Sequence, residues 1–267
     1  MALLLGLGLF SCAPRAELFN HPIVSELQTG IEGGSATFDH GLFDEILQAH
    51  VVLEEGGVDY AGLKEDEGKL DEYLASLAEA PLEELTESEQ LALLINAYNG
   101  YTLKLILENY PGISSIQDLS NPWTTERYVV GGHTLSLDQI EHNIIRPLYK
   151  DPRIHFVVNC AAKDCPYLAD EALTGERLEE QLEERTRAIL QDSNFVRVEG
   201  NRLHFTRIMH WYGDDFVNSD FKGAQATVAA YIAGYATDEV RRFIEAANGD
   251  PATRAMEYDW TLNDVSR

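Results

Sequence analysis

The sequence has few basic residues, few cysteines and no apolar run long enough to span a bilayer. Its 267 residues include 20 lysines and arginines against 45 aspartates and glutamates, a formal net charge of −25. A surface of this sign repels phosphate backbones and anionic lipid, which argues against nucleic acid as a partner. The acidic residues are spread along the predicted helices, which indicates a solvated surface rather than an acidic binding tail.

Internal repeats, low-complexity blocks and a composition change between two domains are also missing. Three cysteines do not make a disulfide-rich miniprotein, and a hydrophobic fraction of 45% provides enough apolar side chains for a sizeable core. Apolar periodicity predicts helices over residues 43–52, 67–80, 85–111 and 175–192. Hairpins are predicted over residues 127–135 and 195–205. We therefore expect one α+β domain, mostly helical, with a small antiparallel sheet.

The N-terminal stretch "MALLLGLGLFSCAP" is far below the roughly 20 apolar residues needed to cross a bilayer. It fits the h-region of a signal peptide. A small residue before Cys12, with a leucine two positions earlier, resembles the lipobox of bacterial lipoproteins. That resemblance implies a signal peptide over residues 1–11 and a lipid anchor on Cys12. The loose polar stretch that follows predicts a linker over 12–37, ahead of a globular domain over 38–267. We then expect the protein at the bacterial cell envelope, membrane-anchored, facing the periplasm or the exterior.

Polar residues where burial is expected are the first candidates for function. Asn96 and Asn99 stand three apart in the apolar stretch "LLINAYNGY", so they share one helix face. They are either buried amides satisfied by backbone groups or amides presented into a polar cleft. Glu141 and His142 are neighbours in "SLDQIEHNII", so on a helix their side chains point about 100° apart and do not pair easily.

The stretch "RIHFVVNCAAKDCP" holds Cys160 and Cys165 at the end of a predicted strand. Alternation along that strand directs His155 and Asn159 to one face and Cys160 to the other. Cys165 precedes Pro166, and proline favours the first position of a helix, whose dipole gives a thiol thiolate character. Cys165 is therefore the first candidate nucleophile and Cys160 the second.

Three interpretations of the cysteine pair are open at this point. A disulfide closing so short a loop would stabilise the fold by less than the typical figure of roughly 2–4 kcal/mol. A metal site lacks a second ligand pair beyond the C-x₄-C spacing, so we expect no metal ligands and no cofactor. A thiol nucleophile would use His142, or His155 in second place, as its base, with Glu141 or an asparagine orienting the imidazole.

Five ordered segments resemble the family catalogued as domain of unknown function 547. They are "VDYAGLK", "LLINAYNGYTLKLILENYP", "GGHTLSLDQIEHNIIRP", "DPRIHFVVNCAAKDCP" and "RIMHWYGDDF". With the helices beside them they run from about Phe38 to Phe243. The usual tryptophan of the family is Leu94 here, and the usual glycine after the first cysteine is Ala161. The shared polar set that this resemblance implies is Asn96, Asn99, Glu141, His142, His155, Asn159, Cys160 and Cys165.

That polar set is similar to a papain- or transglutaminase-like Cys–His–acid site with its segments in a different chain order. It implies an envelope-anchored thiol enzyme, a hydrolase or acyl transferase acting on peptide or amide bonds, including peptidoglycan-like substrates. Asn96, Asn99 and Asn159 would then bind substrate, with Asn96 or Asn99 donating to the oxyanion. The alternative is a non-catalytic binding or scaffold lipoprotein with a Cys160–Cys165 disulfide. A redox protein is disfavoured because the spacing is not C-x-x-C.

Overall fold

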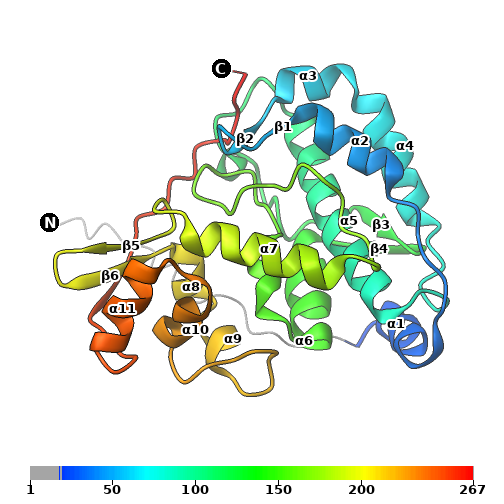
Figure 1. Cartoon of the computed structure of the whole chain (residues 1–267). Coiled ribbons are helices and arrows are strands. Elements are labelled where there is room, and N and C mark those ends of the chain that lie inside the picture. Colours follow the sequence, from blue (N-terminus) through cyan, green and yellow to red (C-terminus); the bar gives the residue numbers. More distant parts are fainter. Residues whose placement is uncertain (1–17, 19, 267) are drawn as a thin grey trace, which may run out of the picture.

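The structure is a computed structural model of the chain, and it describes residue 18 and residues 20–266 (Figure 1). The signal peptide predicted over residues 1–11 and the lipid predicted on Cys12 lie outside the described residues. Within the described part, no helix combines the length and the hydropathy needed to cross a membrane.

Helices make up most of the regular structure, which confirms the predicted α+β domain, mostly helical with small antiparallel sheets. The α-helices are α1 (Pro22–Gly33), α2 (Gly41–His50), α3 (Tyr60–Glu65), α4 (Glu67–Ala78), α5 (Glu87–Leu107), α6 (Arg146–Tyr149), α7 (Leu178–Gln191), α8 (Arg207–Trp211), α9 (Gly213–Val217), α10 (Val228–Tyr235) and α11 (Asp238–Ala246). Between them lie the 3₁₀-helices η1 (Ile116–Asp118) and η3 (Pro152–Phe156) and the π-helix η2 (Gln139–Ile145).

Short strands form small sheets, and both predicted hairpins are present. The strands are β1 (Val51–Val52), β2 (Gly57–Val58), β3 (Tyr128–Val130), β4 (His133–Leu135), β5 (Val196–Glu199), β6 (Arg202–Phe205) and β7 (Thr253–Ala255). The pairs β1–β2, β3–β4 and β5–β6 are antiparallel, whereas β7 adds to β6 in parallel. Gly131 and Gly132 form the β3–β4 turn with φ angles of 55° and 79°, a two-residue turn that favours glycine.

The helix α5 runs through the larger hydrophobic core. Thr86 caps its N-terminus, as predicted, by accepting a hydrogen bond from the Glu89 N–H at 3.2 Å. The helices α1, α3, α4 and α7 and the π-helix η2 all pack against α5. Because these elements cover α5 almost completely, its polar side chains are held in the interior and must find partners there.

A second core lies between the three-stranded sheet and the helices α7 to α11. Val196, Leu203 and Phe205 of the sheet are buried in it. Successive residues of a strand point to opposite faces, so Arg197 and His204 stand on the other face of the sheet, away from this core. The sheet therefore has one apolar and one polar face.

The C-terminal segment after β7 crosses from the second core to the first (Figure 1). Leu262 forms a bridge with Ala162, and Asp264 forms one with Val58 of β2. These bridges hold the C-terminal segment against the loop that carries the cysteines.

The predicted linker is wrong for part of its length. Residues 22–33 form the helix α1, and Ile23 and Leu27 are fully buried in the larger core. Most residues around α1 are polar, so the sequence pattern does not indicate the few apolar residues that pack α1 against α5.

The strand predicted over residues 153–160 is also wrong. Its first half belongs to η3, and irregular backbone follows. Strand alternation therefore does not decide where His155 and Cys160 point. The backbone at Pro166 is irregular as well, so the helix dipole expected to activate Cys165 is not there.

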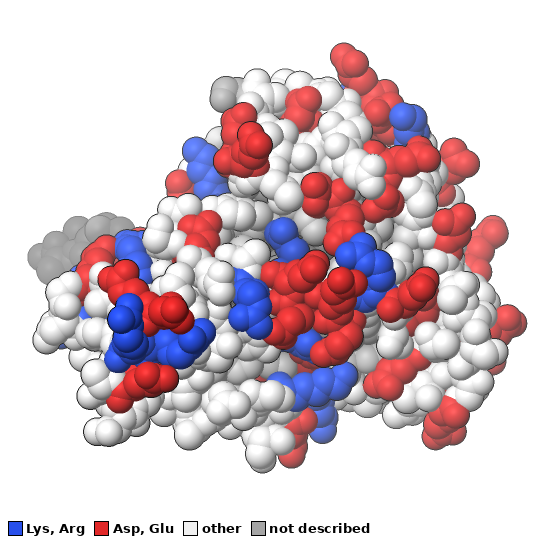
Figure 2. Space-filling model, in the orientation of Figure 1, with Lys and Arg blue, Asp and Glu red and all other residues white. Residues whose placement is uncertain are grey.

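On the face shown in Figure 2, acidic side chains are spread over the surface with basic ones between them. This distribution agrees with a solvated acidic surface.

Candidate functional site

The cysteine loop (residues 157–166) follows η3, and Asn99 on α5 fixes its backbone. The Asn99 amide donates to the Val157 carbonyl oxygen at 2.9 Å, and its Oδ1 accepts the Asn159 N–H at 2.9 Å. Asn159 in turn donates to the Pro166 carbonyl oxygen at 2.8 Å and accepts a backbone N–H inside the loop at 2.9 Å. The two side chains tie the ends of the loop to each other and to the central helix.

The loop turns sharply just after Cys160. Ala161 has a φ of 61°, in the left-handed region that favours glycine, and it is fully buried. This conformation gives a physical reason for the glycine that the family resemblance implies at the position. The turn also brings the Ala162 N–H to the Cys160 sulfur.

The Cys160 thiol is half-buried and meets three hydrogen-bonding groups. Its Sγ lies 3.1 Å from the Sγ of Cys165 and 3.2 Å from the Oη of Tyr258, and the third group is the Ala162 N–H. The hydrogen bond with Cys165 lowers the pKa of Cys160 most, burial opposes it, and the Tyr258 and Ala162 hydrogen bonds lower it further. A half-buried thiol with a lowered pKa has the character of a nucleophile.

Cys165 lies beneath Cys160 and is only 3% exposed. Both cysteines are free thiols, and the Cys165 sulfur accepts the Cys160 N–H at 3.1 Å. Burial raises the pKa of Cys165 well above its usual value, and the adjacent Cys160 raises it further. Cys165 is therefore suited to stay protonated and donate to a Cys160 thiolate, so local chemistry favours Cys160 as the nucleophile.

Glu141 and His142 lie on the π-helix η2. The helix starts with the predicted capping box: the Ser136 N–H donates to Gln139 Oε1 at 2.9 Å, and the Gln139 N–H donates to Ser136 Oγ at 3.2 Å. Its π-helical turns are rare in proteins and occur frequently at functional sites. The Nδ1 of His142 is 3.6 Å from Oε1 of Glu141, and burial lowers the pKa of His142 to about 4.

Glu141 is 5% exposed and lies within electrostatic range of the thiol. Burial raises the pKa of Glu141, against the opposing charges of His155 and Arg146. The Tyr98 hydroxyl also contacts this carboxyl and favours its ionised form. The same carboxyl thus acts on both Cys160 and His155.

His155 pairs with Asp215 in the interior. The two atoms His155 Nε2 and Asp215 Oδ2 are 2.8 Å apart, and Arg146 donates to both Asp215 oxygens at 2.7 and 3.0 Å. Burial would raise the pKa of Asp215, but the hydrogen bonds from His155 and Arg146 lower it to about 2. Burial lowers the pKa of His155, which favours its neutral form.

The rest of the His155 ring is held by stacking. The ring of Tyr212 lies parallel to it, with centroids 4.2 Å apart. Among the described residues, the Nδ1 of His155 has no hydrogen-bond partner. Nδ1 is buried, and one ring nitrogen bonded to a carboxylate with the other unpaired is one feature of a general base, which must also reach the proton that it takes.

The structure brings the candidate residues into one region without joining them all by direct contact. Tyr212, stacked on His155, is within electrostatic range of Glu141 and Cys160. In the described part of the chain, neither His142 nor His155 forms a hydrogen bond with a cysteine sulfur. Glu141 therefore lies within electrostatic range of both Cys160 and His155, but no hydrogen bond among the described residues links the three as in a catalytic triad.

The three asparagines hold backbone. Asn96 donates to the Leu173 carbonyl oxygen at 2.8 Å and accepts the Leu173 N–H at 3.1 Å. Asn99 and Asn159 bind the cysteine loop, as described above. The substrate-binding role expected for these amides stays a prediction, and each amide as it stands is engaged by backbone groups.

All three tryptophans of the chain gather with Tyr258 in one half-buried aromatic cluster. Ring centroids are 4.9 Å apart for Trp211 and Tyr258, 4.6 Å for Tyr258 and Trp260, and 5.8 Å for Trp260 and Trp123. Because the Tyr258 hydroxyl meets the sulfur of Cys160, this cluster borders the thiol. Its partly open rings offer a surface for the apolar part of a ligand.

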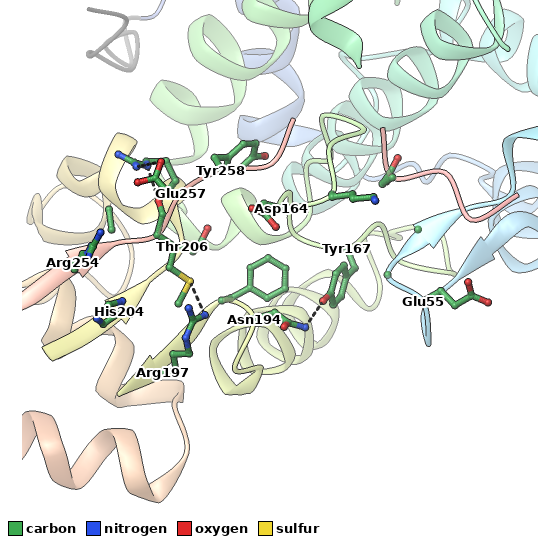
Figure 3. Close-up of a pocket in the computed structure, with 18 of the residues that line it drawn as sticks. Glu55, Asp164, Tyr167, Asn194, Arg197, His204, Thr206, Arg254, Glu257 and Tyr258 are labelled. Atoms are coloured by element: carbon green, nitrogen blue, oxygen red, sulfur yellow. Dashed lines mark hydrogen bonds and ion pairs between the residues drawn. The ribbon is translucent and has the colours of Figure 1, made fainter. Parts of the chain in front are cut away.

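Tyr258 also lines a cavity of about 780 Å³ (Figure 3). Figure 3 shows Arg197, His204 and Arg254 together at one end of this cavity, with Tyr258 and Asp164 nearer its middle. The cavity is within the size range of small-molecule and peptide sites. Within the described residues, no group of three or more His, Cys, Asp or Glu side chains is placed to hold a metal ion.

Sequence reasoning missed Asp215, Arg146, Tyr212 and Tyr258. The segment "RIMHWYGDDF" contains Tyr212 and Asp215, and an acidic residue in so aromatic a stretch was the available signal. Tyr258 carries no such signal, because it stands in an irregular C-terminal segment that reaches the cysteine loop only through the fold.

Residues 82–190 match the family model described as Protein of unknown function, DUF547. This DUF547 region (residues 82–190) supports the resemblance drawn from the ordered segments. It contains α5, η2 and the cysteine loop, while Asp215 and Tyr258 lie beyond it. No curated protein and no solved structure matches the chain.

Proposed function

We propose that the protein is a thiol enzyme, a hydrolase or acyl transferase acting on peptide or amide bonds, with Cys160 as nucleophile. The observation that carries the proposal is the setting of the Cys160 sulfur. It combines partial exposure with three hydrogen-bonding groups and a lowered pKa. A structural thiol buried for packing has no need of such an environment.

In the proposed reaction, His155 accepts the thiol proton while Asp215 holds the imidazole through its Nε2–H. The Cys160 sulfur forms a bond to the carbonyl carbon, and the carbon–nitrogen bond breaks as the leaving amine takes the proton back. Water, or an acceptor amine, then attacks the thioester and releases the thiolate. Glu141, whose pKa is raised by burial, acts electrostatically on both the Cys160 thiol and the His155 imidazole.

A burst experiment with p-nitrophenyl acetate tests the proposal on the mature chain. We expect rapid release of about one equivalent of nitrophenol, slow turnover, and an acetyl group on Cys160 by peptide mass mapping. Cys160→Ala should abolish the burst. A burst that is absent in the wild type, or equal in Cys160→Ala, overturns the proposal. His155→Ala and His142→Ala then identify the base.

A second candidate function, a dithiol redox protein, is favoured by one specific observation. The two sulfur atoms are 3.1 Å apart, and the more exposed thiol has the lower pKa while the buried one has the higher pKa. An attacking thiol and a resolving thiol differ in this way. Cys165→Ala separates the two functions, because an acyl transferase retains its burst without Cys165 and a disulfide exchanger loses all turnover.

We also propose that the domain is anchored at the bacterial envelope by a lipid on Cys12, a proposal that rests on the N-terminal sequence. Fractionation of cells that express the wild type or Cys12→Ser tests it. Wild-type protein should sediment with membranes and the variant should not. If the wild type and Cys12→Ser divide equally between the membrane and soluble fractions, Cys12 carries no lipid anchor.

A further inference from the structure

The polar face of the three-stranded sheet carries a row of basic side chains. Arg197 of β5 is the register partner of His204 of β6, and His204 is the register partner of Arg254 of β7. Register partners point to the same face of a sheet, so the three side chains stand side by side across all three strands. All three line the cavity of about 780 Å³.

This row is unusual in a chain with a formal net charge of −25. Two arginines on one face of the sheet attract anions to that face. Glu199 contacts two of the three, at 2.6 Å from Arg197 and 3.7 Å from His204. Arg254 is exposed and has no carboxylate within ion-pair distance among the described residues.

Tyr258 lies between this cavity and the nucleophile, and Cys160 itself is not among the residues that line the cavity. Tyr258 lines the cavity, and its hydroxyl lies 3.2 Å from the Cys160 sulfur. Arg254 precedes Tyr258 by four positions, and an extended chain advances about 3.3 Å per residue, so the two positions are separated by at most about 13 Å of backbone. An extended peptide of about four residues spans the same length.

We propose that Arg197, His204 and Arg254 bind a free carboxylate of an extended peptide substrate, about four residues from the bond that Cys160 attacks. This inference rests on the proposed function and deepens it by naming the substrate class. Arginine suits the task because its planar guanidinium binds a carboxylate through two parallel hydrogen bonds. The aromatic cluster on the thiol side of Tyr258 then borders the residues at the scissile bond.

Isothermal titration of the full chain carrying Cys160→Ser tests the proposal without any turnover. The probes are acetyl-tetraalanine with a free C-terminal carboxylate and the same peptide with a C-terminal amide. We expect the carboxylate peptide to bind at least tenfold more tightly, and we expect Arg254→Gln to remove that preference. Arg254→Lys should keep part of it. Arg242→Gln, an exposed arginine of α11 outside the cavity, makes the same charge change and should keep all of it.

Equal binding of the two peptides, or a preference that survives Arg254→Gln, overturns the inference. Inorganic phosphate is titrated in parallel, and phosphate that binds more tightly than the carboxylate peptide makes this a phosphate site and also overturns it. Wild-type protein is tested for the nitrophenyl acetate burst at the same time. A burst without carboxylate preference overturns this inference alone, whereas carboxylate preference without a burst overturns the proposed function alone.

Discussion

His155 and Asp215 are sixty positions apart in the chain, yet their side chains meet at 2.8 Å in the interior. The carboxylate fixes the proton of His155 on Nε2, and Tyr212 holds the plane of the ring. Arg146 donates to both oxygens of Asp215, one of which also binds His155, and these hydrogen bonds favour the ionised carboxylate. The pair lies across the end of the DUF547 region, since Asp215 follows residue 190.

Replacing Asp215 with asparagine should slow the acylation burst by roughly 10²–10⁴-fold, the usual worth of a general base held in the correct tautomer. Asp138→Asn serves as the control, because Asp138 carries a carboxylate near His142 and not near His155. The measurement is the burst rate constant, with thermal unfolding recorded for both variants. A folded Asp215→Asn variant with a wild-type burst would remove the pair from the mechanism.

Replacing Cys165 with alanine should raise the pKa of Cys160. The hydrogen bond with Cys165 is the largest influence that lowers this pKa. The midpoint of iodoacetamide labelling at Cys160, followed by mass spectrometry over graded pH, should therefore move to higher pH. Cys165→Ser retains a donor and should shift less. Equal midpoints in all three proteins would show that Cys165 does not tune the thiol.

The larger features of this fold follow from local patterns in the sequence. Thr86 and the apolar stretch after it specify α5, and the pair Gly131–Gly132 specifies a hairpin turn. The capping box of Ser136 and Gln139 correctly marks the start of the helix that becomes η2. Each of these signals acts within a few residues, so it can be recognised without knowledge of the fold.

The site itself depends on contacts that no local pattern contains. The β-branched residues before Cys160 predict a strand. The two hydrogen bonds from the Asn99 side chain on α5, here called the Asn99 clamp, hold this backbone in an irregular loop instead. Tyr258 reaches Cys160 across 98 positions because the C-terminal segment is bridged to the loop. The sequence favours Cys165 through a helix expected at Pro166, whereas burial and the hydrogen bond between the two thiols determine their pKa values in the structure.

Asn99→Ala should destabilise the protein by about 2–4 kcal/mol, because it leaves the Val157 carbonyl and the Asn159 N–H without a partner in the interior. Urea unfolding gives the free energy of unfolding. Asn109→Ala is the matched control, since the Asn109 amide bonds only within its own helix end and its loss should cost under about 1 kcal/mol. A loss for Asn99→Ala no larger than that of the control would contradict the clamp.

Stability should fall as the pH is lowered from about 6.5 to about 4. Burial lowers the pKa of His40 and of His142 to about 4 in the folded state, while an unfolded histidine titrates near 6.5. Between these values the unfolded chain binds protons that the folded chain refuses, so acidification favours unfolding. Each histidine then costs at most about 3 kcal/mol by pH 4.

His142→Gln should weaken this pH dependence, because one of the buried histidines that refuse a proton in the folded state disappears while a polar side chain of similar size remains. The measurement is the free energy of unfolding in urea at pH values from 4 to 7.5. His210→Gln is the control, since His210 is exposed on α8 and replacing it should leave the slope as it is. If His142→Gln has the wild-type slope, His142 binds its proton as readily in the folded chain as in the unfolded one. The buried, neutral imidazole described beside Glu141 would then be wrong.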